Sequence, residues 1–254
     1  APAANIRGEI REAMQEAARS LAQSVDYRGA GTVEFLLDAS GDNFFFLEMN
    51  TRLQVEHPVT EEVFGVDMVK LQWSVANGTG IPDGTDGRSP NSHSIEIRVN
   101  AEDPVAGFMP STGRILDCVW PQGEGIRIDT GVESGSTVTP HYDAMIAKII
   151  VTGSDREDAT RKLVEAIEQT SISPLVTSIP LGRDLVLSRD FADCQFYTRS
   201  IEGDWSDWQM PEVPGDWTAI LAACAQKVLS PTGSGRNKAR PRGSCWDQLQ
   251  GVRP

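Results

Sequence analysis

A pair of short β-prone segments constrains the fold of this 254-residue chain more than any other feature. Thr32–Leu37 and Phe44–Asn50 are rich in β-branched and aromatic residues, and the Ser-Gly-Asp-Asn sequence of residues 40–43 has turn chemistry between them. The pattern predicts a β-hairpin. Because alternate side chains of a strand share a face, we expect one face of the first strand to lie in the core, with Val33, Phe35 and Leu37.

Helical periodicity is found on both sides of this hairpin. Residues Asn5–Asp26 carry apolar side chains three and four positions apart, which predicts an amphipathic helix. After the hairpin, Thr60 is a good N-cap, and Glu61 and Glu62 favour a first helical turn there. We therefore predict a second helix over residues 60–76.

The following part of the chain mixes strands and helices. Four segments are β-prone, and two others have helical periodicity with an apolar face. The predicted strands are Ser94–Asn100, Gly113–Trp120, Gly125–Thr130 and Ala144–Val151, and the predicted helices are Arg156–Gln169 and Pro180–Leu187. This arrangement indicates an α+β fold with a mostly antiparallel sheet. From about Gly203 the pattern fades, and Pro231–Ser244 has the composition of a flexible linker.

Composition argues against several classes of partner. The formal net charge of −13 disfavours nucleic acid, whose binding needs basic patches. No apolar run approaches the ~20 residues of a membrane-spanning helix, and the first residues show no secretion signal. The four cysteines are widely spaced, which is typical of free thiols in a reducing cytosol or mitochondrial matrix. We therefore expect no nucleic-acid partner and no membrane partner.

A run of polar residues follows the second strand of the hairpin. If the chain stays extended past Asn50, alternate residues of this run point to one side, namely Glu48, Asn50, Arg52, Gln54 and Glu56. Glu34 on the partner strand would then lie alongside Glu48. Two carboxylates and an amide oxygen suit a hard cation such as Mg²⁺.

Arg52 and Glu56 extend this candidate site beyond a metal. A guanidinium offers a planar fork to a carbonate-like anion, and Glu56 beside it would be a general base. The alternative is a charged strand face that only contacts water, as most charged faces do. His57 taken alone is more typical of a packed or capping residue than of a catalytic one.

At these residues the chain resembles the biotin carboxylase family, a branch of the ATP-grasp ligases. The resemblance covers roughly Ala3–Ile201 and rests on several motifs in the same order. They are Tyr27–Phe35, Leu47–Glu61, Glu96–Pro104, Phe108–Gly113, Gly125–Arg127 and His141–Lys148. The resemblance implies the C-terminal part of an ATP-grasp domain over residues 1–90 and a biotin carboxylase C-terminal domain over residues 91–202, followed by a linker and a partly disordered tail over residues 203–254.

The resemblance also assigns metal ligands and structural residues. Glu34, Glu48 and Asn50 correspond to the family's ligands for Mg²⁺ or Mn²⁺, which bridges the phosphates of ATP. Other residues in the family motifs are interpreted as structural or subunit-contact residues, namely Arg98, Asp143 and Lys148.

Substrate and catalytic residues follow from the same motifs. Arg52, Gln54 and the backbone of Val55 correspond to the bicarbonate pocket. Glu56 corresponds to the general base that deprotonates bicarbonate for attack on ATP, and Arg127 to the arginine that stabilises the biotin enolate. The resemblance therefore implies that Arg52, Glu56 and Arg127 are catalytic.

Parts of the family's machinery are not found in this sequence. The glycine-rich phosphate loop and the lid lysines are absent, so we expect an N-terminal nucleotide-binding half as a partner and no activity from the chain alone. No Ala-Met-Lys-Met biotinylation signal occurs, so biotin is expected on a separate carrier domain. A carboxyltransferase component and a homo-oligomer are expected in the full enzyme. The face on which the other half packs is expected to be exposed and to promote self-association.

Two alternatives remain open at this stage. The first is a non-catalytic, truncated assembly module, which the missing lid favours and the intact polar residues disfavour. The second is another ATP-grasp ligase, such as a carbamoyl-phosphate synthetase or a purine-pathway ligase. The Arg-Leu-Gln-Val-Glu-His-Pro sequence of residues 52–58 is not expected in such an enzyme.

Overall fold

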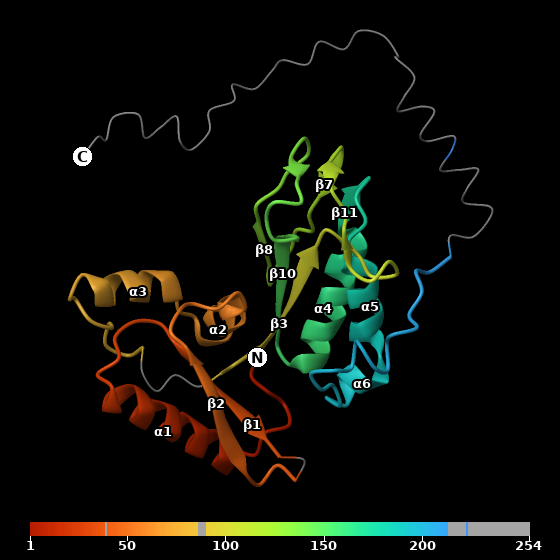
Figure 1. Cartoon of the computed structure of the whole chain (residues 1–254). Coiled ribbons are helices and arrows are strands. Elements are labelled where there is room, and N and C mark those ends of the chain that lie inside the picture. Colours follow the sequence, from red (N-terminus) through yellow and green to blue (C-terminus); the bar gives the residue numbers. More distant parts are fainter. Residues whose placement is uncertain (39, 86–89, 213–221, 223–254) are drawn as a thin grey trace, which may run out of the picture. The chain divides into compact units, whose positions relative to one another are not determined.

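The predicted hairpin forms at its predicted boundaries. In this computed structural model, which describes residues 1–38, 40–85, 90–212 and 222, β1 (Thr32–Leu37) pairs antiparallel with β2 (Phe44–Asn50; Figure 1). The Asp38 carboxylate accepts hydrogen bonds from the Asp42 N–H (3.1 Å) and from the Asn43 side-chain amide (2.8 Å). These bonds satisfy turn groups that the strand ladder leaves unpaired.

A β-bulge interrupts the pairing of this hairpin. Glu34 is opposite Glu48 and Phe35 is opposite Phe46, so Leu47 is an extra residue in β2. Because cross-strand partners share a face, the bulge places Glu48 on the face of Glu34 and Phe46 on the face of Phe35. The rings of Phe35 and Phe46 meet edge to face, with centroids 6.4 Å apart. Regular alternation would have placed Phe46 and Glu48 on one face.

The chain turns directly after β2, which corrects the expectation of a longer extended segment. β2 ends at Asn50, residues 51–56 form an irregular turn, and α2 (His57–Phe64) follows. Pro58 lies in the first turn of α2, where the N–H that proline lacks would have had no helical partner. The polar residues of this run therefore do not share one face of a strand.

A glycine divides the helix predicted over residues 60–76. α2 ends at Gly65, whose left-handed backbone (φ 62°, ψ 44°) favours glycine. α3 (Met68–Ala76) follows with Asp67 as its N-cap, and the Asp67 carboxylate accepts a hydrogen bond of 2.8 Å from the Lys70 N–H. Thr60 lies inside α2, so its prediction as an N-cap is wrong.

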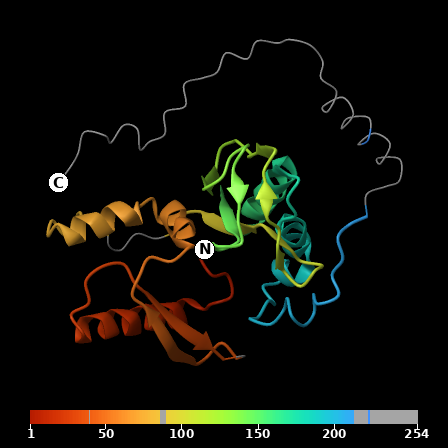
Figure 2. The ribbon, with the colours of Figure 1, turned by 45° about the horizontal axis from the view of Figure 1, so that its top comes forward.

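Three antiparallel strands form the larger sheet, in the order β3 (His93–Asn100), β10 (Met145–Gly153) and β8 (Ile126–Thr130). Helix α4 (Arg156–Gln169) packs against β10 and β3, and α5 (Ile179–Leu187) packs against α4. Figures 1 and 2 show α4 and α5 on one side of the sheet and α2 on the other. The sheet therefore has an apolar face toward α4 and a second face toward α2.

The hydrophobic core lies between the sheet and α4. Its fully buried members include Val99, Ile149, Val151, Leu163 and Ala166. Burying each large aliphatic side chain contributes roughly 1.5–3 kcal/mol. β10 also approaches α4 closely at its end, where a Cβ added to Gly153 would lie 2.4 Å from the backbone nitrogen of Ala159.

Several short strands complete the fold. The segment predicted as one strand over residues 113–120 is two strands with different partners. The other elements are four short strands, helix α6 (Arg189–Ala192) and helix α1 (Gly8–Ser24). The antiparallel pairs are β4 (Glu102–Asp103) with β5 (Met109–Pro110), β6 (Gly113–Arg114) with β9 (Thr137–Val138), and β7 (Asp117–Val119) with β11 (Ser171–Ser173). The fold class is α+β with antiparallel sheets, as predicted.

Two units divide the chain at about residue 210. Ala1–Met210 form the unit that carries these elements, and Pro211–Pro254 form the other. The predicted linker Pro231–Ser244 and most of the predicted tail, from residue 213 on except residue 222, lie outside the described residues. Within the described ranges, no helix has both the length and the apolar character that crossing a bilayer requires.

Candidate active site

The three predicted metal ligands lie together on one face of the hairpin. Asn50 donates from Nδ2 to the Oε1 atoms of Glu34 (2.8 Å) and Glu48 (3.0 Å). Gln54, which was predicted for an anion pocket, donates from Nε2 to the same oxygen of Glu34 at 3.0 Å. The bulge at Leu47 makes this meeting possible, because it turns Glu48 toward Glu34.

The donor set suits a hard divalent cation. The two carboxylates converge on the Asn50 amide, and a cation at that point would replace the N–H group as their partner. Mg²⁺ commonly takes one or two carboxylates and leaves its other positions to water and phosphate. Among the described residues there is no group of three or more His, Cys, Asp or Glu side chains that could hold a metal. Glu34, Glu48 and Asn50 therefore fit a site in which two carboxylates and one amide hold the cation and its other positions are left to water and phosphate.

Residues 51–56 form a turn that is held from the larger sheet. The Val55 carbonyl accepts a hydrogen bond of 2.7 Å from Lys148 Nζ, and Glu56 Oε2 accepts one of 2.9 Å from Arg98 Nη2. Arg52 is exposed, and its Nη1 donates a long hydrogen bond of 3.3 Å to the Leu53 carbonyl. The guanidinium of Arg52 therefore remains accessible to an anion.

His57 fixes the peptide group that precedes Val55. Its Nδ1 lies 2.8 Å from the Gln54 carbonyl oxygen, and a carbonyl only accepts, so this nitrogen carries the proton. In a trans peptide the C=O and N–H groups point in opposite directions. The contact therefore directs the Val55 N–H away from His57. This positioning role agrees with the expectation that His57 is a packed residue.

Arg127 lies on β8 within a ring of carboxylates. Its Nε and Nη2 donate to both oxygens of Asp129 (2.9 and 3.1 Å), and its Nη1 donates to Glu61 (2.7 Å) and, more weakly, to Glu62 (3.4 Å). The hydrogen bonds that Arg127 donates to Asp129 and Glu61 raise the pKa of Arg127, although burial opposes them. Burial alone would raise the pKa of Asp129, but its bonds and charge contacts with Arg127 hold that pKa below its ordinary value.

A pocket of about 620 Å³ opens beside Arg127. Its lining residues come from α2, from the turn between α2 and α3, and from the first turn of α3, namely His57, Glu61, Glu62, Gly65, Val66, Asp67 and Val69. Glu61 is only 7% exposed and also accepts a hydrogen bond of 2.7 Å from the Met68 N–H. Arg127 is therefore the cationic group of an otherwise acidic pocket.

Three further charged residues of this region are Lys148, which was predicted as a structural or subunit-contact residue, and Glu96 and Glu61, for which the sequence predicted no role in the site. Lys148 (11% exposed) lies 3.4 Å from Asp129 and 4.0 Å from Glu96, and Glu96 is 5% exposed. Burial raises the pKa of Glu96 to about 7. Lys148 could have been assigned from the sequence, because a single lysine in the apolar strand 145–151 indicates a buried charge with specific partners. Glu61 gave no such signal, because it was predicted in the first turn of a helix, where acidic residues are common for electrostatic reasons.

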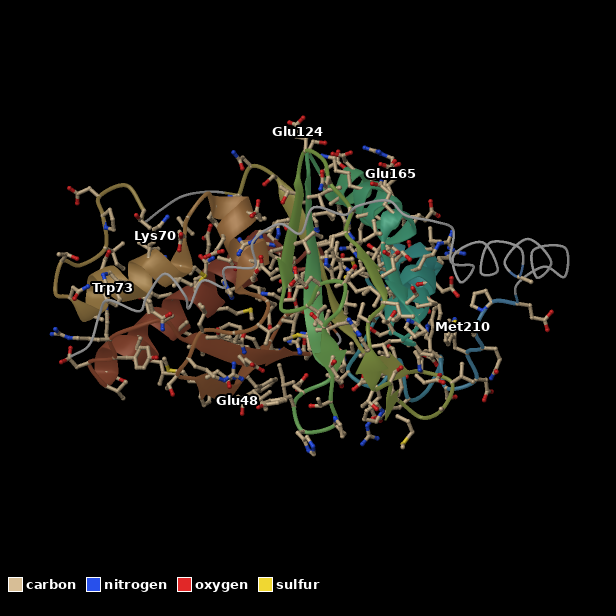
Figure 3. All side chains as sticks on the ribbon, turned by 90° about the horizontal axis from the view of Figure 1, so that it is seen from above. Glu48, Lys70, Trp73, Glu124, Glu165 and Met210 are labelled. Atoms are coloured by element: carbon tan, nitrogen blue, oxygen red, sulfur yellow. The ribbon has the colours of Figure 1, made fainter. Side chains whose placement is uncertain are left out.

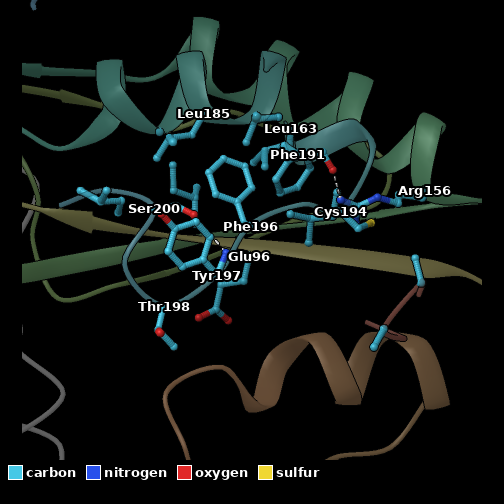
Figure 4. A pocket seen from close by; sticks show the side chains of 17 residues that line it. Glu96, Arg156, Leu163, Leu185, Phe191, Cys194, Phe196, Tyr197, Thr198 and Ser200 are labelled. Carbon is cyan, nitrogen blue, oxygen red and sulfur yellow. Dashed lines mark hydrogen bonds between the residues drawn. The ribbon is translucent and has the colours of Figure 1, made fainter. Parts of the chain in front are cut away.

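The remaining candidates have structural surroundings. Asp143 accepts a hydrogen bond of 2.8 Å from the Met145 N–H, and Cys118 and Cys194 are free thiols. A second pocket, of about 520 Å³, lies beside α4, α5 and the segment after α6, with Leu163, Phe196 and Tyr197 among its lining residues (Figure 4). It contains none of the predicted site residues.

Two family models match separate parts of the chain. The biotin carboxylase C-terminal domain matches residues 96–203, and the ATP-binding domain of the carbamoyl-phosphate synthase L chain matches residues 1–83. Biotin carboxylase 1 of Bacillus subtilis is 40% identical over 201 residues, which are 79% of this chain and 45% of that protein. The mitochondrial methylcrotonoyl-CoA carboxylase subunit alpha of Dictyostelium discoideum is 37% identical over 254 residues, which are 100% of this chain and 36% of that protein.

A solved structure agrees with these matches. The biotin carboxylase domain of the Hydrogenobacter thermophilus 2-oxoglutarate carboxylase, in complex with MgADP, ADP and bicarbonate, is 40% identical, with a TM-score of 0.79. The match covers 84% of this chain and 47% of that one. The chain thus spans less than half the length of each of these three proteins.

Proposed function

This chain belongs to the biotin carboxylase family, and on that premise we propose that it supplies metal, bicarbonate and biotin residues for the ATP-dependent carboxylation of biotin. The observation that carries the proposal is the convergence of Glu34, Glu48 and Asn50 on one hairpin face. The residues fit Mg²⁺ or Mn²⁺, which when bound would neutralise the charge of the ATP phosphates.

The turn of residues 51–56 would bind bicarbonate. Arg52 provides an exposed guanidinium, and the Val55 N–H points away from the contact between His57 and Gln54. Glu56, oriented by Arg98, takes the proton of bicarbonate so that a bicarbonate oxygen attacks the γ-phosphorus of ATP and ADP leaves. The product is carboxyphosphate, which breaks down to CO₂ and phosphate.

Arg127 would act on biotin. The phosphate released from carboxyphosphate removes the N1 proton of biotin, and negative charge develops on the ureido oxygen. A guanidinium held by Asp129 and Glu61 needs no reorientation at that moment, which is the advantage of preorganised charge. The nitrogen of biotin then attacks CO₂ to form carboxybiotin.

The other components of the reaction are proposed as partners. Residues 1–90 would complete an ATP-grasp domain with an N-terminal nucleotide-binding half, and residues 91–202 would form the C-terminal domain. Biotin would arrive on a carrier domain and leave toward a carboxyltransferase component, in a homo-oligomeric enzyme of the cytosol or mitochondrial matrix. The mitochondrial methylcrotonoyl-CoA carboxylase of Arabidopsis thaliana, whose matching chain is named subunit alpha, supports the expectation of partner subunits.

Biotin-stimulated ATP hydrolysis tests the proposal. It is measured with bicarbonate and Mg²⁺ for this chain alone, and again with the nucleotide-binding half of Bacillus subtilis biotin carboxylase 1 added. We expect no turnover from the chain alone and turnover after the addition. Silence from two halves that demonstrably associate would favour the assembly module, and turnover from the chain alone would contradict our account of ATP binding.

Two variants test the residue assignments in the active mixture. Glu56→Gln and Arg127→Ala should each abolish biotin-stimulated turnover and leave the circular dichroism spectrum unchanged. Glu124→Gln and Arg189→Ala are the matched controls, because Glu124 is exposed (labelled in Figure 3) and the side chain of Arg189 is 91% exposed. Full activity in either site variant would overturn that assignment.

A further inference from the structure

Lys148 is a buried cation in the middle of an apolar strand. It is the single charged residue of β10, and its side chain is 11% exposed. A buried ammonium is costly unless it is paired and hydrogen-bonded. Its partners are the Val55 carbonyl (2.7 Å), Asp129 Oδ2 (3.4 Å) and Glu96 Oε2 (4.0 Å). The ammonium thus joins the turn of residues 51–56 to the larger sheet.

The position of Lys148 is not explained by sheet stability. Its partner across the β3–β10 ladder is Arg98, and like charges directly opposite each other destabilise a sheet. Both cations reach the same turn, where Lys148 holds the Val55 carbonyl and Arg98 holds the Glu56 carboxylate. Two opposed cations therefore fix two consecutive residues of the proposed bicarbonate turn.

Asp129 connects this arrangement to Arg127. Lys148 and Asp129 are opposite each other on β10 and β8. Asp129 Oδ2 accepts from Arg127 Nη2 at 3.1 Å and lies 3.4 Å from Lys148 Nζ. While Lys148 donates to Val55, this oxygen is available to Arg127. A lysine released from Val55 would move toward Asp129 and compete with Arg127 for it.

We propose that Lys148 is a positioning residue that couples the turn of residues 51–56 to Arg127 through Asp129. Any change at the Val55–Glu56 peptide is passed to the Arg127 guanidinium by way of the shared carboxylate. The proposal rests on the proposed function in one respect. If the turn binds bicarbonate and Arg127 binds biotin, the occupancy of one site tunes the other.

Nuclear magnetic resonance of the full chain without ligand tests the coupling directly. The variant is Lys148→Gln, and the readouts are the Arg127 Nε–H resonance and the amide resonances of Val55 and Glu56. We expect all three resonances to shift, because the Val55–Glu56 peptide loses the hydrogen bond at its carbonyl. A change at the turn amides with no change in the Arg127 resonance, or no change at either place, would contradict the coupling.

The chain offers a matched control and a second variant. Lys162 also donates to a backbone carbonyl (Thr152, 3.0 Å) and pairs with a carboxylate (Asp158, 3.4 Å), so Lys162→Gln should change neither readout. Asp129→Asn removes the connecting charge and should change the turn amides as well as Arg127. It provides the decisive comparison if Lys148→Gln does not fold, and unchanged turn amides in it would contradict the proposal.

Steady-state kinetics in the two-half assay separate the coupling from the proposed function. Lys148→Gln should raise the KM values for bicarbonate and for biotin several-fold and leave that for ATP unchanged. Aminoethylation of Lys148→Cys, which restores an ammonium group, should reverse both changes, with wild type treated alike because the chain has four cysteines of its own. If wild type shows no turnover, the proposed function fails, and the resonance experiment still decides the coupling.

Discussion

The charged side chains around Lys148, on the sheet face toward α2 and in the adjoining turn, include both carboxylates and cations. The carboxylates of Glu56, Glu96 and Asp129 act on one another across the cations Lys148 and Arg98. Both oxygens of Glu96 lack a hydrogen-bond partner among the described residues. Burial raises the pKa of Glu96 to about 7, so this carboxyl retains its proton more readily than the others.

Glu96 should therefore make stability depend on pH. Its pKa is about 7 when folded and 4.5 as the ordinary value, so the folded state binds the proton more tightly between these limits. The free energy of unfolding should fall as the pH rises through this window. Glu96→Gln should remove the fall and add about 2 kcal/mol of stability above it. Urea unfolding from pH 5 to about 8, with Glu124→Gln as control, measures this. A variant less stable than wild type at neutral pH would show that Glu96 is ionised and supports Lys148.

Local sequence determines one part of the site and leaves the other undetermined. Glu34, Glu48 and Asn50 were predicted together because they belong to one hairpin, whose turn sets the pairing. The contact of Arg127 with Glu61 joins residues 66 positions apart. No local pattern specifies such a pair, because it depends on how α2 packs against the sheet.

Element boundaries follow the residues that begin and end helices. The helix Arg156–Gln169 was predicted at its observed bounds, and Asp155 caps it by accepting a 2.9 Å hydrogen bond from the Asp158 N–H. The division of α2 from α3 was missed, although Gly65 and Asp67 form a helix stop and a new N-cap. Thr60 has a side chain that can cap a helix as Asp67 does, and only the packing of the folded chain decides which of the two residues begins a helix.

Gly153 should be essential to the junction of β10 and α4. An added Cβ would lie 2.4 Å from the Ala159 nitrogen and 2.8 Å from the Asp158 carbonyl carbon, and backbone atoms cannot move aside as a flexible side chain does. Gly153→Ala should lower the free energy of unfolding by about 2 kcal/mol or more. Gly8→Ala is the control, since a Cβ there meets nothing within 4 Å. Denaturant unfolding of both variants measures the difference, and equal stabilities would refute the close approach.

The molecule as a whole exposes several large apolar side chains. Phe45 is 60% exposed on β2 and Trp73 is 72% exposed on α3, where Figure 3 shows it projecting from the ribbon. None of the residues of α1 is buried. Large apolar surfaces of this kind usually mark interaction sites. They agree with the expectation that the N-terminal part of the chain packs against another body.

The isolated chain should therefore self-associate in a concentration-dependent way. Phe45→Ser combined with Leu47→Ser should weaken the association, because burying each such side chain contributes roughly 1.5–3 kcal/mol. Tyr142→Ser is the control, since Tyr142 is 85% exposed but does not belong to the hairpin. Sedimentation velocity over a range of concentrations measures the effect. Equal association of the control and the double variant would place the contact elsewhere.

The extra residue at Leu47 makes the chemistry of the hairpin depend on the formation of the bulge in β2. If β2 paired without the bulge, Leu47 would lie opposite Glu34, and Glu48 would turn to the other face although every functional side chain is still in the sequence. Homologues should therefore be compared by spacing as well as by identity. A relative that lacks this one residue would be expected to bring both glutamates together by regular pairing, whereas a relative that keeps the residue needs the bulge to do so.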